Sequence, residues 1–594
     1  MMTLSQMILG RAASSPSRAA FRVRRGETYA DVTWAEVSLR VDAIAAGLLS
    51  AASLDDGACI SIVGSTSLAS CLVDFAALGV GLKTVPVYAS LLPEEVGYMH
   101  VDTATQLIVV DDASQLEKVR AFRGGFTFFE RRYAANELAV RAKVVVIHPG
   151  ALAPSDDWES LDALEARGRA AGLYDELQRR RSLIRREQVA TYTYTSGTTG
   201  APKAVIQTHD NMLSMLEDVG EAGLMDAKVK QHGLFLFLPA AHSFGRMVEF
   251  AGPFFDAPIV LSSVPTLAAD LAASRPGFFP AAPRVFEKMM AKIVAGVEGT
   301  AGVKRTLADW ALRVGREVAD LRVAGRPVPY TLELQRRLAD TLVLSKLRAR
   351  LGLDNASALL SGAAALRTDV QLFFLALGLT VLEAYGLTET CPGLTVNRRD
   401  DARPGTVGQA FERVELKVAP DGELLARGPN ITRGYLNRPD ATADVFDEEG
   451  WFHTGDLGSI DADGFVRITG RKKELLKTSG GKYVAPLKIE AQLKKHRIVQ
   501  EAVVVGDGRN YCTALFALDA EMLASFDRAQ VDGILKGLVD EANSTLAPFE
   551  QIKTFRVSPG PFTVDGGELT ASLKVKRHVV AQKHAALIES MYAA

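Results

Sequence analysis

The sequence predicts an α/β protein with a large multi-sheet N-terminal domain and a small α+β C-terminal domain. Short apolar runs of β-forming residues alternate with helical stretches over the first three quarters of the chain, a pattern typical of largely parallel sheets. With 594 residues the chain is too long for one hydrophobic core, so two or more domains are expected. We place the domains at residues 1–470 and 471–594.

The expected strands of the N-terminal domain include the apolar runs 59–63, 107–110, 143–147 and 258–261. The arginine-rich run 179–186 predicts a solvated helix face or loop. Between Arg284 and Gly352, a composition rich in Ala, Leu, Arg, Lys and Glu predicts two or more amphipathic helices around a Pro/Gly break at 325–329. The domain boundary follows a turn-rich segment at 461–465, and a strand is expected at 502–506 in the small domain.

Composition narrows the functional class. A hydrophobic content of 48% with 23% charged residues is that of an ordinary globular protein. The net charge of −2 argues against a nucleic-acid partner, which a basic protein would favour. The four cysteines are scattered without C-x-x-C spacing, so we expect no zinc site or disulfide framework and favour a reducing cytoplasm.

The first ten residues lack a basic segment followed by a long apolar core, so no signal peptide is expected. The most apolar windows, 234–241 and 372–381, are too short and too interrupted to span a bilayer. Peripheral contact with a membrane surface stays open, and the oligomeric state cannot be read from the sequence.

The run 192–203, Tyr-Thr-Tyr-Thr-Ser-Gly-Thr-Thr-Gly-Ala-Pro-Lys, carries the clearest chemistry. From Thr195 to Lys203 it holds four hydroxyl side chains, two glycines and one lysine. Glycines let backbone N–H groups approach an anion, and hydroxyls and a lysine add donors and positive charge. The run does not fit G-x-x-x-x-G-K-[ST], because Ala204 follows Lys203. Strand-like runs on both sides favour a polyphosphate-binding loop over a flexible linker.

Three further blocks occur in order along the chain: Tyr-Gly-Leu-Thr-Glu-Thr at 385–390, Trp-Phe-His-Thr-Gly-Asp-Leu-Gly at 451–458, and Glu-Leu-Thr-Ala-Ser-Leu-Lys-Val-Lys-Arg at 568–577. With the loop at 195–203, they resemble the motifs of the adenylate-forming enzymes, which include acyl-CoA synthetases, luciferase and peptide-synthetase adenylation domains. The resemblance runs from residue 32 to residue 577. The helical stretch 283–351 and the last block look most like bacterial long-chain fatty acyl-CoA ligases.

The resemblance implies a nucleotide site with a magnesium ion. Glu389 matches the family's magnesium ligand, with Thr198 as its hydroxyl neighbour, and hard oxygen ligands suit Mg²⁺. Asp456 matches the aspartate that accepts hydrogen bonds from both ribose hydroxyls, as its two oxygens allow, and Arg471 adds a second contact. The nucleotide-binding residues expected from the motifs are Thr195, Ser196, Gly197, Thr198, Thr199, Gly200, Lys203, Gly362, Tyr385, Gly386, Thr388, Asp456 and Arg471.

The segment 238–246 resembles the part of the family that lines the acyl pocket, where His242 either contacts the substrate or serves a structural role. The segment 361–366, Ser-Gly-Ala-Ala-Ala-Leu, stands where relatives carry Gly-Gly-Ala-Pro on the adenine side. Ala363 and Ala365 replace the second glycine and the proline, which adds a methyl group and removes a rigid turn element.

In the small domain, which the resemblance implies is mobile, Lys574 matches the catalytic lysine. A lysine can neutralise charge that develops between a carboxylate and the α-phosphate. Lys576 and Arg577 are the alternatives if the register is shifted, and Ala571 stands where the family has proline. Lys473 falls at the family's hinge, and Gly480 and Gly481 fall on the loop that approaches CoA.

The implied activity is ATP-dependent activation of a long-chain fatty acid as acyl-adenylate, followed by transfer to CoA, so fatty acid, ATP, Mg²⁺ and CoA are the expected ligands. Small-domain rotation would keep the reactive anhydride from water. The alternatives are an acyl-AMP ligase that loads a carrier protein, an aryl-acid ligase, and a non-catalytic lipid- or nucleotide-binding relative. The sequence leaves the acyl chain length undecided.

Overall fold

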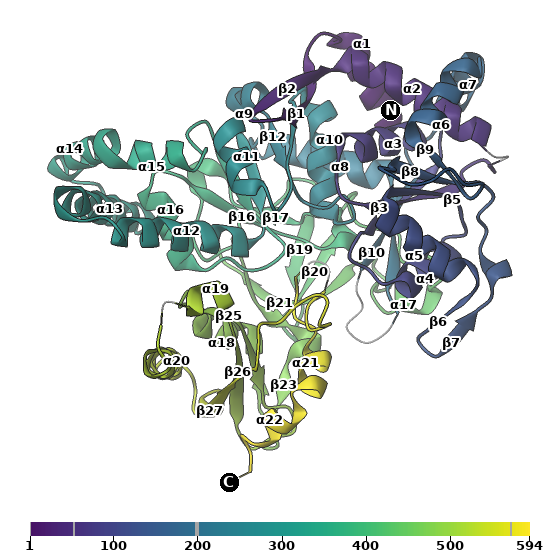
Figure 1. Ribbon diagram of the computed structural model, residues 1–594. Helices are drawn as coiled ribbons and strands as arrows, with labels where there is room; N and C mark the ends of the chain where they lie inside the picture. The colour runs from purple at the N-terminus through teal and green to yellow at the C-terminus, as the bar shows by residue number, and fades with distance from the viewer. Residues whose placement is uncertain (1, 52–53, 196–200, 525, 571–572, 594) are drawn as a thin grey trace. The chain divides into compact units, whose positions relative to one another are not determined.

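The computed structural model describes residues 2–51, 54–195, 201–524, 526–570 and 573–593. The chain forms two compact units, one of residues 1–415 and 426–452, the other of residues 416–425 and 453–594 (Figure 1). The first unit is a large multi-sheet α/β structure and the second a smaller α+β structure, which confirms the predicted fold class. The functional boundary after residue 470 stays a prediction.

A seven-stranded sheet occupies the first half of the larger unit. Its order is β11 (Lys203–Thr208), β10 (Val189–Thr195), β4 (Lys83–Tyr88), β3 (Cys59–Gly64), β5 (Thr105–Asp112), β8 (Val144–His148) and β9 (Trp158–Ser160). All neighbours are parallel except β10 and β11, which form an antiparallel pair. Strand β3 is buried along nearly its whole length, as expected where helices cover both faces of a parallel sheet.

Helices connect these strands and begin at recognisable caps. The set comprises α2 (Trp34–Ala51), α3 (Leu68–Gly79), α4 (Pro93–Asp102), α5 (Ala113–Arg123), α6 (Leu161–Ala170) and α7 (Tyr174–Leu183). The side chain of Ser67 accepts from the Ser70 N–H at the start of α3, and Asp112 accepts from Ser114 and Gln115 at the start of α5. Such caps satisfy backbone donors that the first helical turn leaves unpaired. A small hairpin of β6 (Phe126–Phe128) and β7 (Arg131–Tyr133) lies in the same unit.

A nine-stranded sheet forms the rest of the larger unit. Its order is β18 (Gln409–Ala410), β17 (Thr395–Val396), β16 (Val381–Tyr385), β15 (Ala358–Ser361), β14 (Phe278–Ala281), β12 (Leu234–Leu236), β13 (Ile259–Leu261), β1 (Ala19–Arg25) and β2 (Thr28–Thr33). The accompanying helices are α1 (Leu4–Ser14), α8 (His209–Glu221), α9 (Ala227–His232), α10 (Ser243–Phe255), α11 (Leu267–Ser274), α16 (Thr368–Ala376) and α17 (Pro439–Ala443). Every strand predicted by residue range in this domain is present.

The predicted helical stretch is also confirmed. It contains α12 (Pro283–Glu298), α13 (Gly302–Val323), α14 (Tyr330–Ala339), a π-helical turn (Asp340–Leu344) and α15 (Ser345–Arg350). The Pro/Gly break at 325–329 separates α13 from α14, because proline cannot continue a helix. The inner faces of these helices join a core that includes Phe286, Val314, Leu344 and Phe374.

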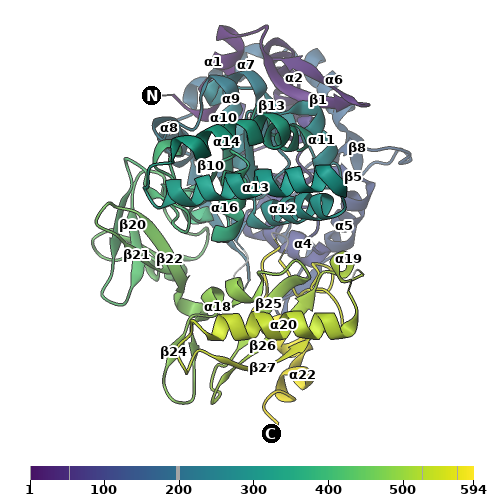
Figure 2. The same ribbon diagram turned by 90° about the vertical axis from the view of Figure 1, so that its left-hand side faces the viewer.

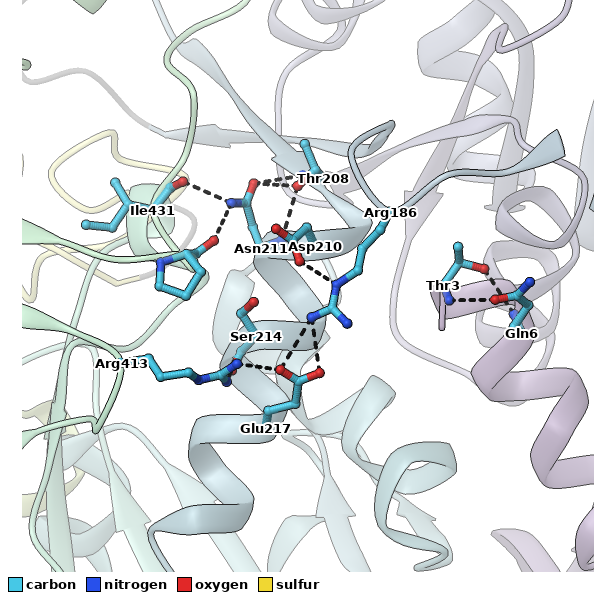
Figure 3. A network of polar contacts seen from close by, with 11 residues as sticks. Thr3, Gln6, Arg186, Thr208, Asp210, Asn211, Ser214, Glu217, Arg413 and Ile431 are labelled. Carbon is cyan, nitrogen blue, oxygen red and sulfur yellow. Dashed lines mark hydrogen bonds and ion pairs between the residues drawn. The ribbon is translucent and has the colours of Figure 1, made fainter. Parts of the chain in front are cut away.

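The prediction that the arginine-rich run 179–186 is a solvated helix face or loop is only partly right. Arg179 is half exposed, as expected for a solvated face, but Arg181 is buried and forms an ion pair with Asp42. Arg186 is largely buried too and contacts Asp210 and Glu217 (Figure 3). Carboxylates from distant parts of the chain compensate these charges, so the run anchors α2 and α8 rather than being wholly solvated.

In its described residues, the smaller unit contains two larger sheets and one short pair of strands. Most of a four-stranded sheet belongs to it, in the order β19 (Glu415–Val418), β20 (Glu423–Arg427), β21 (Phe452–Ile460) and β22 (Val466–Arg471). A three-stranded sheet of β25 (Val499–Val505), β26 (Cys512–Leu518) and β27 (Ile552–Val557) carries α18 (Pro486–Leu493) and α20 (Arg528–Asn543). The remaining elements are β23 (Leu476–Lys477), β24 (Tyr483–Val484), α19 (Ala520–Leu523), α21 (Arg577–Lys583) and α22 (Ala585–Glu589).

Within the described ranges, no helix is both long enough and apolar enough to cross a bilayer. Cys59, Cys71, Cys391 and Cys512 are all buried free thiols.

Candidate active site

The two ends of the predicted phosphate loop lie side by side. Thr195 at the end of β10 pairs directly with Lys203 at the start of β11 in the antiparallel ladder. The intervening residues of the predicted loop, Ser196, Gly197, Thr198, Thr199 and Gly200, lie outside the described residues. The described ends of the motif therefore lie on two paired strands, as the flanking strand-like sequence predicts.

Glu389 and Lys203 meet at a tyrosine. The hydroxyl of Tyr435 donates to Oε1 of Glu389 at 2.8 Å, and Nζ of Lys203 lies 5.0 Å from the centre of the Tyr435 ring. The first contact is a hydrogen bond to a carboxylate and the second is a cation–π contact. One side chain thus positions a carboxylate and an ammonium group from two separate motifs.

The backbone around Tyr435 is held by Asn211 near the start of α8. The Asn211 amide donates to the carbonyl oxygens of Pro429 at 2.7 Å and Ile431 at 2.9 Å (Figure 3). The next residue, Thr432, donates its N–H to the Glu389 carbonyl at 2.8 Å. Tyr435 was missed by the sequence reasoning, and its only local signal is the Gly434–Tyr435 pair after a polar stretch.

The segment that carries Glu389 turns sharply after β16. Tyr385 ends the strand, and Gly386 has no room for a side chain, because an added Cβ would lie 1.9 Å from the Pro392 carbonyl oxygen. Thr388 and Glu389 follow in a single 3₁₀ turn, Thr388–Thr390. Gly386 is therefore required for the path of this backbone.

Gln207 joins three of the predicted blocks. Its buried amide donates to the carbonyl of Thr388 at 2.8 Å and, more weakly, to the Ser243 hydroxyl at 3.4 Å, while its oxygen accepts from Thr193 at 2.9 Å. Thr193 precedes the phosphate loop, Ser243 follows His242, and Thr388 precedes Glu389. Sequence reasoning missed Gln207, since a glutamine inside a strand has no distinctive local signature.

His242 caps α10. Its Nδ1 accepts from the Phe244 N–H at 3.1 Å, so the ring orients the start of the helix. A very small cavity borders this helix, and its lining is mixed: Met212, Leu216, Met247, Phe250, Cys391, Gln207, Ser243 and Arg246. The described contact of His242 is thus a structural one at the start of α10.

The adenine-side segment approaches α10. A Cβ on Gly362 would lie 3.3 Å from the Phe244 ring, so the two predicted segments are in contact. Ala363 adopts a left-handed backbone with φ of +72°, the conformation that suits the glycine of relatives. Beneath the segment, Glu383 accepts from the Leu366 N–H and from Gln371, both at 2.9 Å. Burial raises the pKa of Glu383 to about 8.

In the smaller unit, Asp456 and Arg471 are cross-strand partners on β21 and β22. Nε of Arg471 donates to Oδ1 of Asp456 at 2.8 Å, and the Asp456 side chain is largely buried. The arginine orients the carboxylate that the sequence assigns to the ribose.

Glu423 is a third residue that the sequence motifs did not reveal. Its buried carboxylate accepts from Nζ of Lys472 at 2.8 Å and from the Gly455 N–H at 2.9 Å. Burial acts to raise the pKa of Glu423, but the hydrogen bonds from Lys472, His453 and Gly455 outweigh it and lower the pKa. Glu423 therefore links Lys472, which precedes the predicted hinge residue Lys473, to Gly455, which precedes Asp456.

Lys574 is exposed next to the bridged residue Val575. Residues Leu569 and Val575 form a β-bridge, and the Thr570 N–H donates to the Lys574 carbonyl at 2.7 Å. By contrast, Arg577 is directed into the unit, where Nη1 donates to Glu490 at 2.7 Å and Nε donates to Glu474 at 3.3 Å. The geometry supports Lys574 over Arg577 as the lysine-motif residue that faces solvent.

The predicted hinge and CoA-loop residues of this unit are also exposed. Lys473 is in the 3₁₀ turn Lys472–Glu474 directly after β22. Gly480 and Gly481 are at the exposed tip of the β23–β24 hairpin, and Gly481 has a φ of +73°.

The family chemistry implies a magnesium ion with ATP. Among the described residues, no group of three or more His, Cys, Asp or Glu side chains could form a metal cage. A single carboxylate nevertheless fits Mg²⁺, which usually takes one or two protein ligands and completes its shell with phosphates and water. Glu389 fits that pattern, and its predicted partner Thr198 lies outside the described residues.

Fold and motifs together define an AMP-binding enzyme, and the chain belongs to that family. The family of AMP-binding enzymes matches residues 10–436, and the AMP-binding enzyme C-terminal domain matches residues 473–594. These matches confirm the family expected from the sequence motifs.

Curated relatives match over nearly the whole chain. The sequence is 34% identical to long-chain-fatty-acid–CoA ligase FadD15 of Mycobacterium bovis, over 95% of this chain and 92% of the relative. It is 28% identical to long-chain-fatty-acid–CoA ligase ACSBG2 of Xenopus laevis, over 90% of this chain and 76% of the relative.

A solved structure supports the fold. The A-PCP didomain of carboxylic acid reductase from Segniliparus rugosus, in complex with AMP, has a TM-score of 0.74 and 20% identity. The match covers 100% of this chain and 82% of that chain.

Proposed function

We propose that this protein is an ATP-dependent ligase that activates a long-chain fatty acid as acyl-adenylate and transfers it to CoA, releasing AMP and pyrophosphate. The observation that carries the proposal is the meeting of Lys203 and Glu389 at Tyr435. It brings together an ammonium group from the phosphate-loop motif and the carboxylate assigned to magnesium, the two charges that a metal–polyphosphate complex requires. The relatives, by name long-chain fatty acid–CoA ligases, supply the substrate class.

In the first step, a carboxylate oxygen of the fatty acid attacks the α-phosphorus of ATP, and pyrophosphate leaves with the electrons of the broken P–O bond. The segment from Thr195 to Lys203 would hold the phosphates. When bound, Mg²⁺ supplies positive charge to the phosphate oxygens, and Glu389 and Thr198 would hold it. The residues proposed to border the adenine and the α-phosphate are Gly362, Tyr385, Gly386 and Thr388.

We place the start of the acyl chain beside α10 because segment 238–246 resembles the part of the family that lines the acyl pocket. His242 fixes the first turn of this helix and would act by orienting it.

The smaller unit is proposed to serve both steps. Lys574 would neutralise charge at the carboxylate and the α-phosphate in the first step, and Asp456, oriented by Arg471, would accept hydrogen bonds from the ribose. In the second step the CoA sulfur attacks the acyl carbonyl carbon, the bond to the phosphate oxygen breaks, AMP leaves, and the thiol proton passes to solvent. Rotation about Lys473 would bring Gly480 and Gly481 to CoA.

The test is mass-spectrometric product analysis with ATP, Mg²⁺ and a mixture of fatty acids, with and without CoA. We expect acyl-CoA, AMP and pyrophosphate when CoA is present. Acyl-AMP that accumulates despite CoA would instead favour loading of a carrier protein. Turnover of aryl acids alone would change the substrate class, and absence of turnover with every acid would overturn the ligase proposal.

A further inference from the structure

Helix α14 exposes an apolar stripe on the larger unit. Tyr330, Leu334, Leu338 and Leu342 recur every four residues, and 77%, 46%, 53% and 37% of their surfaces are exposed. Leu332, Ala339 and Leu344 on the other side are buried. Because residues four apart share one face of a helix, these side chains form a continuous surface, here called the α14 face.

The π-helical turn Asp340–Leu344 extends the α14 face. On a regular α-helix, a four-residue repeat drifts slowly around the axis, since one turn takes 3.6 residues. The wider π turn works against this drift, so Leu342 stays close to the line of Leu334 and Leu338. Figure 2 shows α14 running beside α13 on the outside of the larger unit, and Figure 1 shows the same pair at one edge of it.

The surroundings of the stripe are basic. Residues 302–350 contain 11 Lys and Arg against five Asp and Glu, whereas the whole chain has a net charge of −2. Arg326, Arg337, Lys346 and Arg350 are exposed. The two acidic groups of residues 330–350 are outnumbered by the basic side chains around them. Glu333 pairs with Arg336 at 2.8 Å and more loosely with Arg322 and Arg337, both at 3.7 Å, and Asp340 pairs with Arg348. The positive charge of the α14 face is therefore in excess.

We propose that the α14 face docks on the surface of a lipid bilayer that contains anionic lipids. The four apolar side chains would enter the headgroup region, and Arg326, Arg337 and Lys346 would contact lipid phosphates. An apolar stripe with basic flanks is the arrangement by which surface helices bind such membranes, through buried apolar area and attraction to negative lipids. This docking goes beyond the proposed ligase activity and does not depend on it.

The charge of the segment distinguishes this partner from a second copy of the chain. Two copies meeting through the α14 face would bring like charges together, which opposes association. A negatively charged bilayer is complementary to both the apolar and the basic parts of the face.

The experiment is flotation of the full-length protein with vesicles of phosphatidylcholine alone or mixed with phosphatidylglycerol, without ATP or fatty acid. We expect binding to the mixed vesicles that weakens with added salt, since exposed charges are screened. The variant L334S/L338S should lower the partition coefficient by roughly tenfold or more, because it removes two alkyl side chains that docking would bury in the bilayer. The variant R337E/K346E should lower it by a similar factor, on the order of tenfold, by reversing two charges.

Two matched control variants carry the same kinds of substitution outside the α14 face. L39S/V264S replaces two exposed apolar residues outside the α14 face, and K488E/K536E reverses two exposed lysines of the smaller unit. Both should bind like the wild type. Circular dichroism checks that the variants fold, and the charge-reversal pair keeps the test valid if the serine pair is unstable.

Three results would overturn the proposal: no binding of the wild type to mixed vesicles, equal losses in test and control variants, or a concentration-dependent dimer that L334S/L338S abolishes. Because binding is read without substrates, these outcomes are independent of whether the ligase activity is found.

Discussion

The side-chain amide of Gln207 donates a hydrogen bond to the backbone carbonyl of Thr388 at 2.8 Å. The contact links the strand after the phosphate loop to the turn that carries Glu389. Both partners are held in place by their own elements, β11 and the 3₁₀ turn Thr388–Thr390. Gln207 is therefore a positioning residue for the proposed adenylation chemistry.

Substitution of Gln207 by leucine should slow ATP–pyrophosphate exchange with a larger effect on kcat than on the KM for ATP. Leucine keeps most of the volume but leaves the Thr193 hydroxyl without its Gln207 partner, at a cost of about 1–3 kcal/mol. The Thr388 carbonyl loses its shorter hydrogen bond and keeps only the one from the Cys391 N–H at 3.3 Å. Gln207→Asn is the conservative variant for rescue. The control Gln106→Leu removes a comparable amide that bonds Asp55, and it should lower stability without changing exchange. Equal exchange in the two leucine variants would contradict the positioning role.

Removal of the Tyr435 hydroxyl should raise the Mg²⁺ concentration needed for half-maximal exchange. Tyr435→Phe deletes the donor to Glu389 but keeps the ring against Lys203, and a hydrogen bond to a charged group contributes about 1.5–3 kcal/mol. Tyr435→Leu also removes the cation–π contact and should raise the KM for ATP further. Tyr29→Phe, which deletes a hydroxyl bonded to the Leu261 carbonyl, is the control. An unchanged Mg²⁺ dependence in Tyr435→Phe would show that Glu389 does not need this donor.

The buried carboxyl of Glu383 should make stability depend on pH. Its folded-state pKa is about 8, raised by burial from an ordinary value of 4.5, so the folded state binds a proton that the unfolded state has released between these values. Stability from this group is complete below pH 4.5, falls as pH rises toward 8, and then levels off. One bound proton corresponds to a slope of about 1.4 kcal/mol per pH unit.

The measurement is urea denaturation from pH 5 to pH 9, roughly the span over which such a group titrates, for wild type and Glu383→Gln. In the variant, the free energy of unfolding should fall less steeply with pH, by the slope that one bound proton contributes, since glutamine does not titrate. Parallel curves for the two proteins would refute the assignment of the pH dependence to Glu383. Glu249, whose pKa burial also raises, remains in both proteins and cancels in the comparison.

Substitution of Lys574 should affect activity without affecting stability, whereas substitution of Arg577 should lower stability. Lys574→Ala should abolish adenylate formation, spare thioester formation from supplied acyl-adenylate, and leave the melting temperature unchanged, because its side chain is exposed. Arg577→Met should destabilise the smaller unit by about 3 kcal/mol, because Glu490 and Glu474 lose their ion-pair partner.

The pair of variants is its own control. Loss of both half-reactions in Lys574→Ala would show that its role is not confined to the first step. A normal melting temperature in Arg577→Met, together with loss of adenylation, would move the catalytic assignment to Arg577.

Local patterns were sufficient for the fold class, whereas the roles they assign to the site residues stay predictions. Strands such as β3 and β5 were predictable because their apolar runs are continuous, and the break at 325–329 because proline and glycine act on their own backbone. The arginine run 179–186 was misjudged because the partner of Arg181, Asp42, lies 139 positions away. A charged residue is easily predicted to be exposed when the residue that pairs with it lies far away in the sequence.

The sequence by itself determined the family, the α/β architecture and the residue types available for binding a polyphosphate, because motif spacing and hydrophobic periodicity are local properties. The tertiary structure alone decided which groups meet. Tyr435 contacts Glu389 across 46 positions, Gln207 reaches Thr388 across 181, and Lys472 reaches Glu423 across 49. Such contacts depend on how the sheets bring distant strands together, so no local pattern could have revealed them.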